Sequence, residues 1–134
     1  TSVVRYAAVD DVGVVVNPTI VHGQVQGGLA QGIGQVLMEH IVYDEEGQLL
    51  SGSFMDYGMP RANDIPVARV ELHEVPARSN PLGVKGAGEC GVTGAVAATI
   101  NAVSDALWRA GASADIQMPA TAERVWRALS LMRS

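Results

Sequence analysis

The sequence is organised around the stretch Pro81-Leu82-Gly83-Val84-Lys85-Gly86-Ala87-Gly88-Glu89-Cys90-Gly91. This stretch precedes the longest apolar run of the chain, which begins near Val92. A glycine-rich loop before a helix offers bare backbone N–H groups, the positive end of the helix dipole and room for close approach of a ligand. A carboxylate at the centre of the loop would repel an anion held there. We therefore expect the loop backbone to bind and Glu89 to have a separate chemical role.

Length and composition indicate a single domain over residues 1–134. The chain is 48% hydrophobic and 17% charged, which is enough apolar material for a core. A net charge of −5 without a Lys/Arg cluster argues against nucleic-acid binding. We expect no membrane span, because Asn101, Asp105 and Arg109 interrupt the best apolar candidate. The single cysteine, Cys90, excludes an internal disulfide and an iron–sulfur cluster held by this chain alone, and a cytoplasmic location is the default.

Hydrophobic periodicity predicts an α+β fold, a small mixed sheet with a hairpin packed against three helices. The expected elements, in order, are a strand over 3–9, a helix over 19–40, a hairpin over 41–50, a strand over 67–73, and helices over 93–109 and 121–132. Thr93 is the expected N-cap of the second helix, and Gly111 is expected to end it. Gly47 can supply the positive φ of the hairpin turn. Residues 52–66 read as an irregular loop that is functional or covers a partner.

The first predicted helix carries five glycines, each of which costs about 1 kcal/mol relative to alanine. They are Gly23, Gly27, Gly28, Gly32 and Gly34. One explanation is close packing, since pairs of these glycines are four residues apart and would let another backbone approach. The other is a backbone opened to a ligand, with Gln24, Gln26 and Gln31 as neutral hydrogen-bond donors. Periodicity leaves both explanations open.

Motif spacing alone does not assign the chemistry. Residues 86–91 match G-x-G-x-x-G, but no strand directly precedes them and Asp105 would lie inside a helix, so a dinucleotide fingerprint is not supported. From spacing, a helix-capping or solvated Glu89 competes with a general base. Cys90 reads as a small buried residue rather than a nucleophile. The three histidines lack metal-ligand spacing, and Asp10-Asp11 reads as a solvated turn.

Three segments together carry a family resemblance. They are residues 9–18 with Asp10-Asp11-Val12-Gly13 and Asn17-Pro18, the glycine and glutamine segment 23–34, and Gly83-Val84-Lys85-Gly86-Ala87-Gly88-Glu89. Residues 53–57 and 118–126 also fit. In this order the segments resemble the C-terminal part of the molybdopterin-binding large subunit of the molybdenum hydroxylases. This is the xanthine dehydrogenase/aldehyde oxidase family, and the nearest members are the large chains of bacterial aerobic carbon monoxide dehydrogenase-like and aldehyde dehydrogenase-like enzymes.

The resemblance implies a molybdenum cofactor, as molybdopterin cytosine dinucleotide, and an oxidoreductase that hydroxylates a carbon of an aldehyde or N-heterocycle. Glu89 matches the catalytic base. The positions that match cofactor-binding segments are Gln24, Gly27, Gly28, Lys85, Gly86, Ala87 and Gly88. No metal ligand from this chain is implied.

The resemblance also implies what this chain lacks. We expect it to be a portion of a longer large subunit and inactive alone, with the remaining part of that subunit as its first partner. Iron–sulfur clusters and FAD are expected on partner subunits or domains, and a small molecule as substrate. The alternatives are a non-catalytic packing or interaction domain that retains the fold, and a stand-alone nucleotide-binding module suggested by the literal G-x-G-x-x-G.

Overall fold

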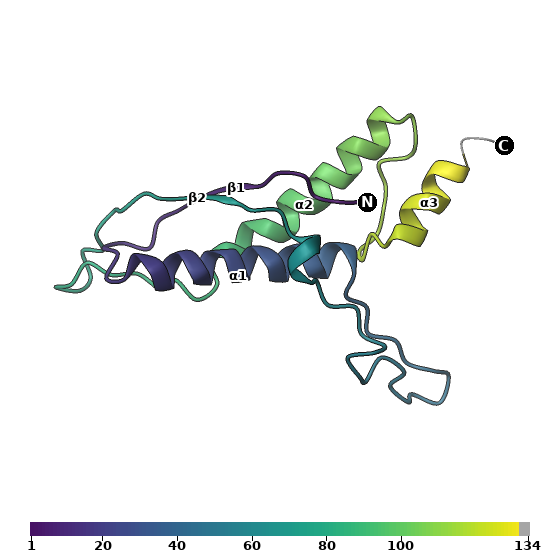
Figure 1. Cartoon of the computed structure of the whole chain (residues 1–134), viewed down its shortest axis with the longest axis horizontal. Helices are drawn as coiled ribbons and strands as arrows, with labels where there is room; N and C mark the ends of the chain where they lie inside the picture. The colour runs from purple at the N-terminus through teal and green to yellow at the C-terminus, as the bar shows by residue number, and fades with distance from the viewer. Residues whose placement is uncertain (132–134) are drawn as a thin grey trace.

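The computed structural model describes residues 1–131, which form helices and one small sheet (Figure 1). The elements in order are β1 (Ala7–Asp10), α1 (Pro18–Leu37), a 3-10 turn (Ala62–Asp64), β2 (Arg69–Leu72), α2 (Cys90–Arg109) and α3 (Ala122–Ser130). The α+β class and the three helices expected from the sequence are confirmed. Both strands are shorter than the predicted ranges, with four residues each.

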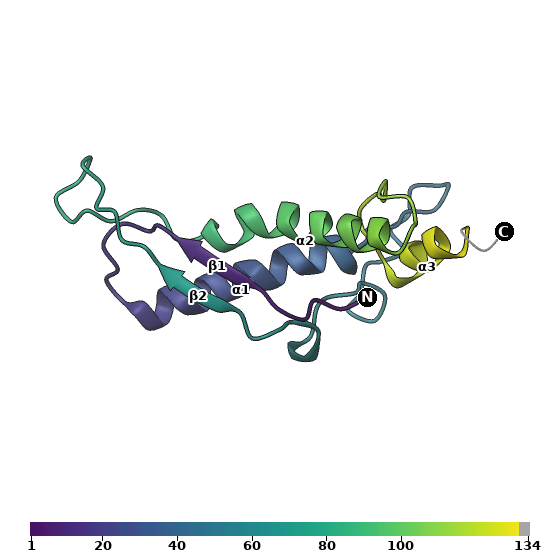
Figure 2. The same cartoon turned by 90° about the horizontal axis from the view of Figure 1, so that it is seen from above.

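Helices α1 and α2 pack against each other and form the body of the molecule, with α2 inclined to α1 in Figure 1 (Figures 1 and 2). One core cluster, under the sheet, contains Val25 and Leu29 of α1 with Ala95 of α2. A second cluster, towards α3, is built around Ile33, Val36, Leu37, Val103, Leu107, Ala112 and Ala120. The apolar periodicity of the sequence predicts that Ile20, Val25, Leu29, Ile33 and Leu37 share one face of this helix. Four of them are buried, and Ile20 is 67% exposed.

Strands β1 and β2 pair in parallel, with Ala7 opposite Arg69 and Asp10 opposite Leu72. Helix α1 lies between them in sequence, as a parallel connection requires. The expected mixed sheet is instead a two-stranded parallel sheet, because the hairpin does not join it. The physical reason is distance: α1 has 20 residues and so carries the chain about 30 Å away from the end of β1 before the hairpin begins.

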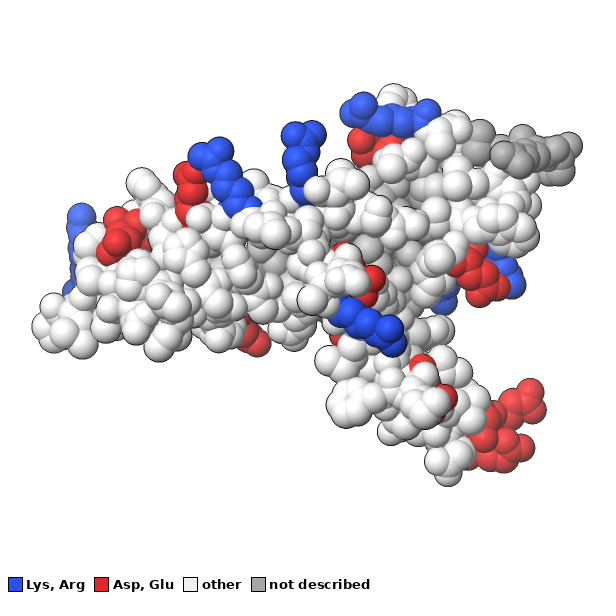
Figure 3. All heavy atoms as spheres, viewed as in Figure 1, with Lys and Arg blue, Asp and Glu red and all other residues white. Residues whose placement is uncertain are grey.

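The predicted hairpin forms as part of an arm that projects from the end of α1 (Figure 1). Tyr43 and Leu49 make an antiparallel bridge, and Gly47 adopts φ +82° in the turn, as expected. Acidic side chains gather at the far end of this arm (Figure 3), where the sequence has three consecutive carboxylates, Asp44, Glu45 and Glu46. In the irregular part of the arm, Phe54 and Met55 are 89% and 96% exposed. The arm therefore presents apolar side chains that the described residues do not cover.

Helix α2 begins earlier than the sequence predicts. Its N-cap is Glu89, and Thr93 lies one turn inside, where its hydroxyl donates to the Glu89 carbonyl at 2.8 Å. Thr93 as the N-cap was therefore wrong. The earlier start follows from packing, because Gly91 is buried against the backbone of α1 and is held in the first turn. Gly111, with φ +84°, follows the helix end as predicted.

The other helix caps follow the sequence signals. The Asn17 side chain accepts a hydrogen bond from the backbone N–H of Ile20 and starts α1, and the Thr121 hydroxyl accepts from Arg124 and starts α3. The sequence predicts an apolar face of α3 made of Val125, Trp126, Leu129 and Met132. Trp126 is 65% exposed, and Met132 lies outside the described residues.

By length and composition α2 could cross a membrane. In the structure it is a core helix along one side, where Gly91, Ala95, Thr99, Val103 and Leu107 are buried. Core helices of this kind meet the same compositional test. The absence of a membrane span remains a prediction.

Candidate functional site

The glycine loop is fastened to the segment that follows β1. Gly13 and Val84 form an antiparallel bridge, and Lys85 N–H donates to the Val12 carbonyl at 2.9 Å. Gly13 adopts φ +67°, and a Cβ there would lie 2.2 Å from the Gly83 carbonyl oxygen. Only glycine permits both this conformation and this approach. Two of the sequence segments that carry the resemblance are therefore in direct contact.

Asp11 holds this contact together. One carboxylate oxygen accepts hydrogen bonds from the backbone N–H groups of Gly13 and Val75, at 2.9 and 3.2 Å. The other oxygen pairs with the Lys85 ammonium at 2.5 Å. The hydrogen bond from Lys85, followed by that from Gly13, lowers the pKa of Asp11 from 3.8 to about 2. Asp11 was expected to be a solvated turn residue. Its spacing of two from Gly13 is the only sequence signal for this role.

The same contacts define what Lys85 does within the chain. Its backbone N–H and its ammonium group are both bonded to the segment after β1. Lys85 therefore orients the loop backbone, and its binding to an outside group stays a prediction.

Gln24 connects the glycine loop to α1. Its side-chain Nε2 donates to the Gly88 carbonyl at 2.8 Å, across a sequence separation of 64 residues. The two segments that the sequence assigns to one site are thus joined at the residue next to Glu89. Both Gln24 and Gly88 are exposed, so this bond lies at the surface of the described chain.

Two groups of glycines can be distinguished in α1, in the loop and at the start of α2. A Cβ at Gly28 would lie 2.8 Å from the backbone N of Val92, and one at Gly91 would lie 2.4 Å from the carbonyl oxygen of Val25. Gly32 faces Ala95 at similarly short range. These three positions are close-packing glycines that let α1 and α2 touch.

The second group faces open space. A Cβ at Gly23, Gly27, Gly86 or Gly88 would meet no atom of the described chain within 4 Å. Close packing and an open backbone, which the sequence left as alternatives for α1, are therefore both present on different glycines. Gly28 belongs to the packed group, whereas its neighbour Gly27 is open.

A hollow of about 460 Å³ lies beside the open glycines of α1. Its lining residues include Gly23, Gln26 and Gly27 of α1 and Arg61 from the segment before the 3-10 turn. Arg61 brings a guanidinium group that the sequence analysis did not single out, because no motif surrounds it. A second, apolar hollow of about 410 Å³ between residues 1–7 and α2 contains none of the predicted site residues.

Glu89 is exposed at the N-terminus of α2, with no hydrogen bond from its side chain to cap the helix. Within residues 1–131 its carboxylate takes part in no hydrogen bond or ion pair shown by the structure. The capping role considered from the sequence is therefore not what holds it there. The carboxylate remains available to a group outside the described chain.

Cys90, next to Glu89, has a structural role. Its thiol donates to the Ala87 carbonyl at 3.1 Å, which closes the end of the loop. Burial, together with the charge of Asp10, raises the pKa of the Cys90 thiol. A protonated thiol is a poor nucleophile, in agreement with the packing role expected from the sequence.

Comparisons with known proteins agree with this arrangement. Residues 1–66 match the family model described as a molybdopterin cofactor-binding domain. The chain is 46% identical over 121 residues to the large subunit of nicotine 6-hydroxylase from Paenarthrobacter nicotinovorans, covering 90% of this chain and 15% of that subunit. It is 40% identical to the carbon monoxide dehydrogenase large chain of Afipia carboxidovorans, covering 92% of this chain and 15% of that one.

A solved structure extends the agreement to the fold. Quinoline 2-oxidoreductase from Pseudomonas putida 86 superposes with a TM-score of 0.89 and 41% sequence identity, over 96% of this chain and 16% of that one. The chain belongs to the molybdenum hydroxylase family. The family expected from the sequence is confirmed, and the chain corresponds to a molybdopterin-binding part of the large subunit. It spans about 15% of the length of the large subunits from P. nicotinovorans and A. carboxidovorans that it matches.

The geometry of this molybdenum hydroxylase chain fits its cofactor. Molybdopterin carries anionic phosphate, and the open glycines give it bare backbone without a Cβ in the way. Gln24 and Arg61 add donors that suit an anion. Within residues 1–131, no group of three or more His, Cys, Asp or Glu side chains is placed to hold a metal ion.

Proposed function

We propose that this chain forms one wall of the molybdenum cofactor site of a hydroxylase and supplies its catalytic base, Glu89. The observation that carries the proposal is the hydrogen bond from Gln24 to the Gly88 carbonyl. It holds α1, at Gln24, next to the loop that ends in Glu89. The cofactor is molybdopterin cytosine dinucleotide, and its pyrophosphate is bound by the Gly27 region and by the backbone of residues 85–88.

Glu89 acts as a base because its carboxylate is exposed and not committed to any interaction within the described chain. It accepts the proton of the oxygen nucleophile that attacks an electron-poor carbon of an aldehyde or an N-heterocycle. When bound, the molybdenum cofactor supplies the two-electron oxidation. The hydrogen bond from Gln24 to Gly88, one residue before, limits the movement of the Glu89 backbone.

The complete enzyme contains more than this chain. The remainder of the large subunit completes the cofactor site and the substrate pocket, and iron–sulfur and FAD-containing subunits or domains carry electrons away. The relatives support such an assembly, since they include a large subunit, a large chain and a subunit gamma of a dehydrogenase complex. The isolated chain is inactive, and the enzyme is cytoplasmic.

The proposed wall of the cofactor site can be tested by filling the open space beside α1 with a side chain. Gly27→Val in the complete enzyme would add a branched side chain in the open space beside α1. We expect the molybdenum content, and the cytidine monophosphate released from the cofactor by acid, to fall by about ten-fold or more, because each 1.4 kcal/mol lost in binding costs a factor of ten. The measurement is metal analysis with nucleotide chromatography on the purified enzyme.

Gly94→Val is the matched control, since Gly94 is also helical, exposed and open but does not line the hollow beside Gly27. It should keep the normal cofactor content. Equal cofactor content in the two variants would contradict the proposed wall. It would favour a packing domain that retains the fold without binding the cofactor.

A further inference from the structure

Strand β1 has one edge that no other strand of the described chain covers. On its paired side, the Tyr6 carbonyl accepts a hydrogen bond from the N–H of Arg69 at 3.0 Å. Because backbone groups point alternately to the two sides of a strand, the N–H and C=O groups of Ala7 and Val9 face the opposite edge. Within residues 1–131 the sheet has the order β1-β2, so this edge is unpaired.

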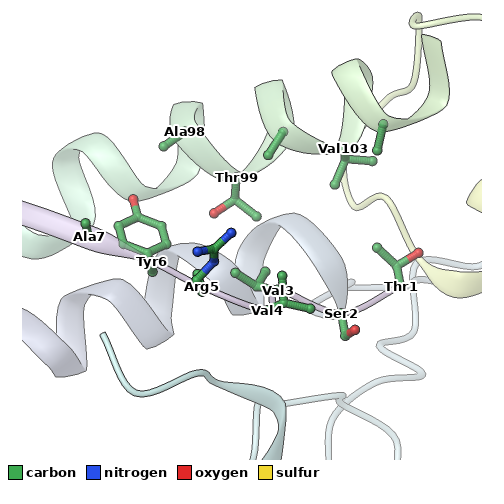
Figure 4. A pocket seen from close by; sticks show the side chains of 12 residues that line it. Thr1, Ser2, Val3, Val4, Arg5, Tyr6, Ala7, Ala98, Thr99 and Val103 are labelled. Atoms are coloured by element: carbon green, nitrogen blue, oxygen red, sulfur yellow. The ribbon is translucent and has the colours of Figure 1, made fainter. Parts of the chain in front are cut away.

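A hollow of about 410 Å³ lies beside this edge, between residues 1–7 and the outer part of α2. Figure 4 shows side chains from the N-terminal segment and from α2 on opposite sides of the space. Helix α2 contributes three small residues, Ala98, Ala102 and Ala106, which are all exposed. Small side chains on this face allow another backbone to approach α2 closely.

Thr99 gives the hollow one polar group. Its side chain is only 3% exposed and lines the space (Figure 4), and its hydroxyl has no hydrogen-bond partner among the described residues. Buried hydroxyl groups in folded proteins almost always have a partner. The unpartnered hydroxyl indicates that a hydrogen-bonding group from outside the described chain reaches this position.

We propose that an additional β-strand from the remainder of the large subunit pairs with the free edge of β1 and lies across α2 over this hollow. A strand fits because it offers backbone donors and acceptors to Ala7 and Val9, whereas a helix uses its own internally. Parallel sheets are normally buried and larger than two strands. The side chains of the added strand that face α2 are apolar, and one of its polar groups bonds to Thr99.

The identity of the partner rests on the proposed function, which makes this chain part of a longer subunit. The chain spans about 15% of the large subunits that it matches, so most of such a subunit is available to supply the strand. A second copy of this chain and a small apolar molecule are the other possible occupants, and the tests below separate them.

Amide hydrogen exchange in the complete enzyme tests the added strand residue by residue. The amides of Ala8 and Asp10 already face β2 and serve as the internal reference. We expect Ala7 and Val9 to exchange within about ten-fold of those references, because both edges of β1 are then hydrogen-bonded. Faster exchange of Ala7 and Val9 by more than about ten-fold would overturn the proposal. So would protection that disappears when the enzyme is diluted, because it would assign the edge to a second copy.

The substitution Thr99→Val tests whether the Thr99 hydroxyl has a partner, because the direction of the change in unfolding temperature differs between the two cases. Valine has nearly the same shape but no hydroxyl. If the added strand bonds to Thr99, the variant lowers the unfolding temperature of the complete enzyme. If the hydroxyl has no partner, as with an empty hollow or an apolar molecule, the unfolding temperature is unchanged or higher, which would overturn the proposal.

A pair of tryptophan variants tests the position. Ala102→Trp fills the hollow, and Ala97→Trp makes the same change at an exposed position of α2 that does not line it. We expect a lower yield of assembled enzyme for Ala102→Trp only. Equal yields of assembled enzyme for the two variants would contradict the proposed position of the added strand. None of these tests measures turnover. The added strand can therefore be disproved while loss of activity in a variant without the Glu89 carboxylate still supports the proposed function. Equally, the proposed base can be disproved while these tests still support the added strand.

Discussion

Two carboxylates near the glycine loop, Asp11 and Glu89, differ in their hydrogen-bond and ion-pair partners. Asp11 is joined to Lys85 and to the backbone N–H groups of Gly13 and Val75, whereas Glu89 has no such partner in the described chain. The resemblance predicts that Glu89 is a catalytic base, and this role stays a prediction. The structural role of Asp11 could not be predicted from the sequence, because its ion-pair partner, Lys85, is 74 residues away in the chain and is brought to it only by folding.

The lowered pKa of Asp11 predicts a pH dependence of stability. The pKa falls from 3.8 to about 2 in the folded protein. The stabilisation from the ionised carboxylate is therefore complete above about pH 4 and is lost as the pH falls from about 4 to about 2. In the matched variant Asp11→Asn, the shape is kept but the charge is removed. The unfolding midpoints of the two proteins should differ at pH 6 and converge towards pH 2. A difference that stays constant over this range would contradict the assigned ion pair.

At the scale of elements, the contact between α1 and α2 depends on which glycines face inward. Gly27 and Gly28 are adjacent, yet Gly27 is open and Gly28 lies against Gly91 and Val92. The sequence predicted both helices and the four-residue spacing of the glycines. It could not predict which glycines pack, because that depends on the rotation of each helix about its axis.

This contact predicts opposite effects of the same substitution at neighbouring positions. Gly28→Ala places a methyl group 2.8 Å from a backbone nitrogen of α2, so the helices must separate and the unfolding free energy should fall by about 1–3 kcal/mol. Gly27→Ala should leave it unchanged or raise it by up to about 1 kcal/mol, since alanine is the better helix former. Denaturant unfolding of both variants measures this. Equal or greater stability of Gly28→Ala would contradict the packing.

Sheet and hairpin show a second limit of sequence-based prediction. The alternation in residues 67–73 and the turn at Gly47 correctly predicted a strand and a hairpin. That the hairpin projects on an arm instead of joining the sheet depends on the length and direction of α1 (Figure 1). Likewise, Thr93 looks like an N-cap in sequence, but contact of Gly91 with α1 moves the helix start to Glu89.

At the scale of the whole molecule, the surface indicates a chain that functions inside a larger assembly. Large apolar side chains are exposed on the arm, on α2 and on α3, including Phe54, Met55, Trp108 and Trp126. The described chain also has a free edge on β1 and an exposed surface beside Gln24. The family could be predicted from three short segments, whereas the surfaces that contact the rest of the subunit required the fold.

The central claim is that Glu89 is the base of a molybdenum hydroxylase, and Glu89→Gln in the complete enzyme tests it most directly. Glu45→Gln, the same change at the exposed hairpin tip, is the control. The measurement is the turnover rate per bound molybdenum. We predict that Glu89→Gln keeps its molybdenum and loses about 10²–10⁴-fold in turnover, the usual contribution of a general base, while Glu45→Gln is unchanged. Normal turnover by Glu89→Gln with full molybdenum content would contradict the account.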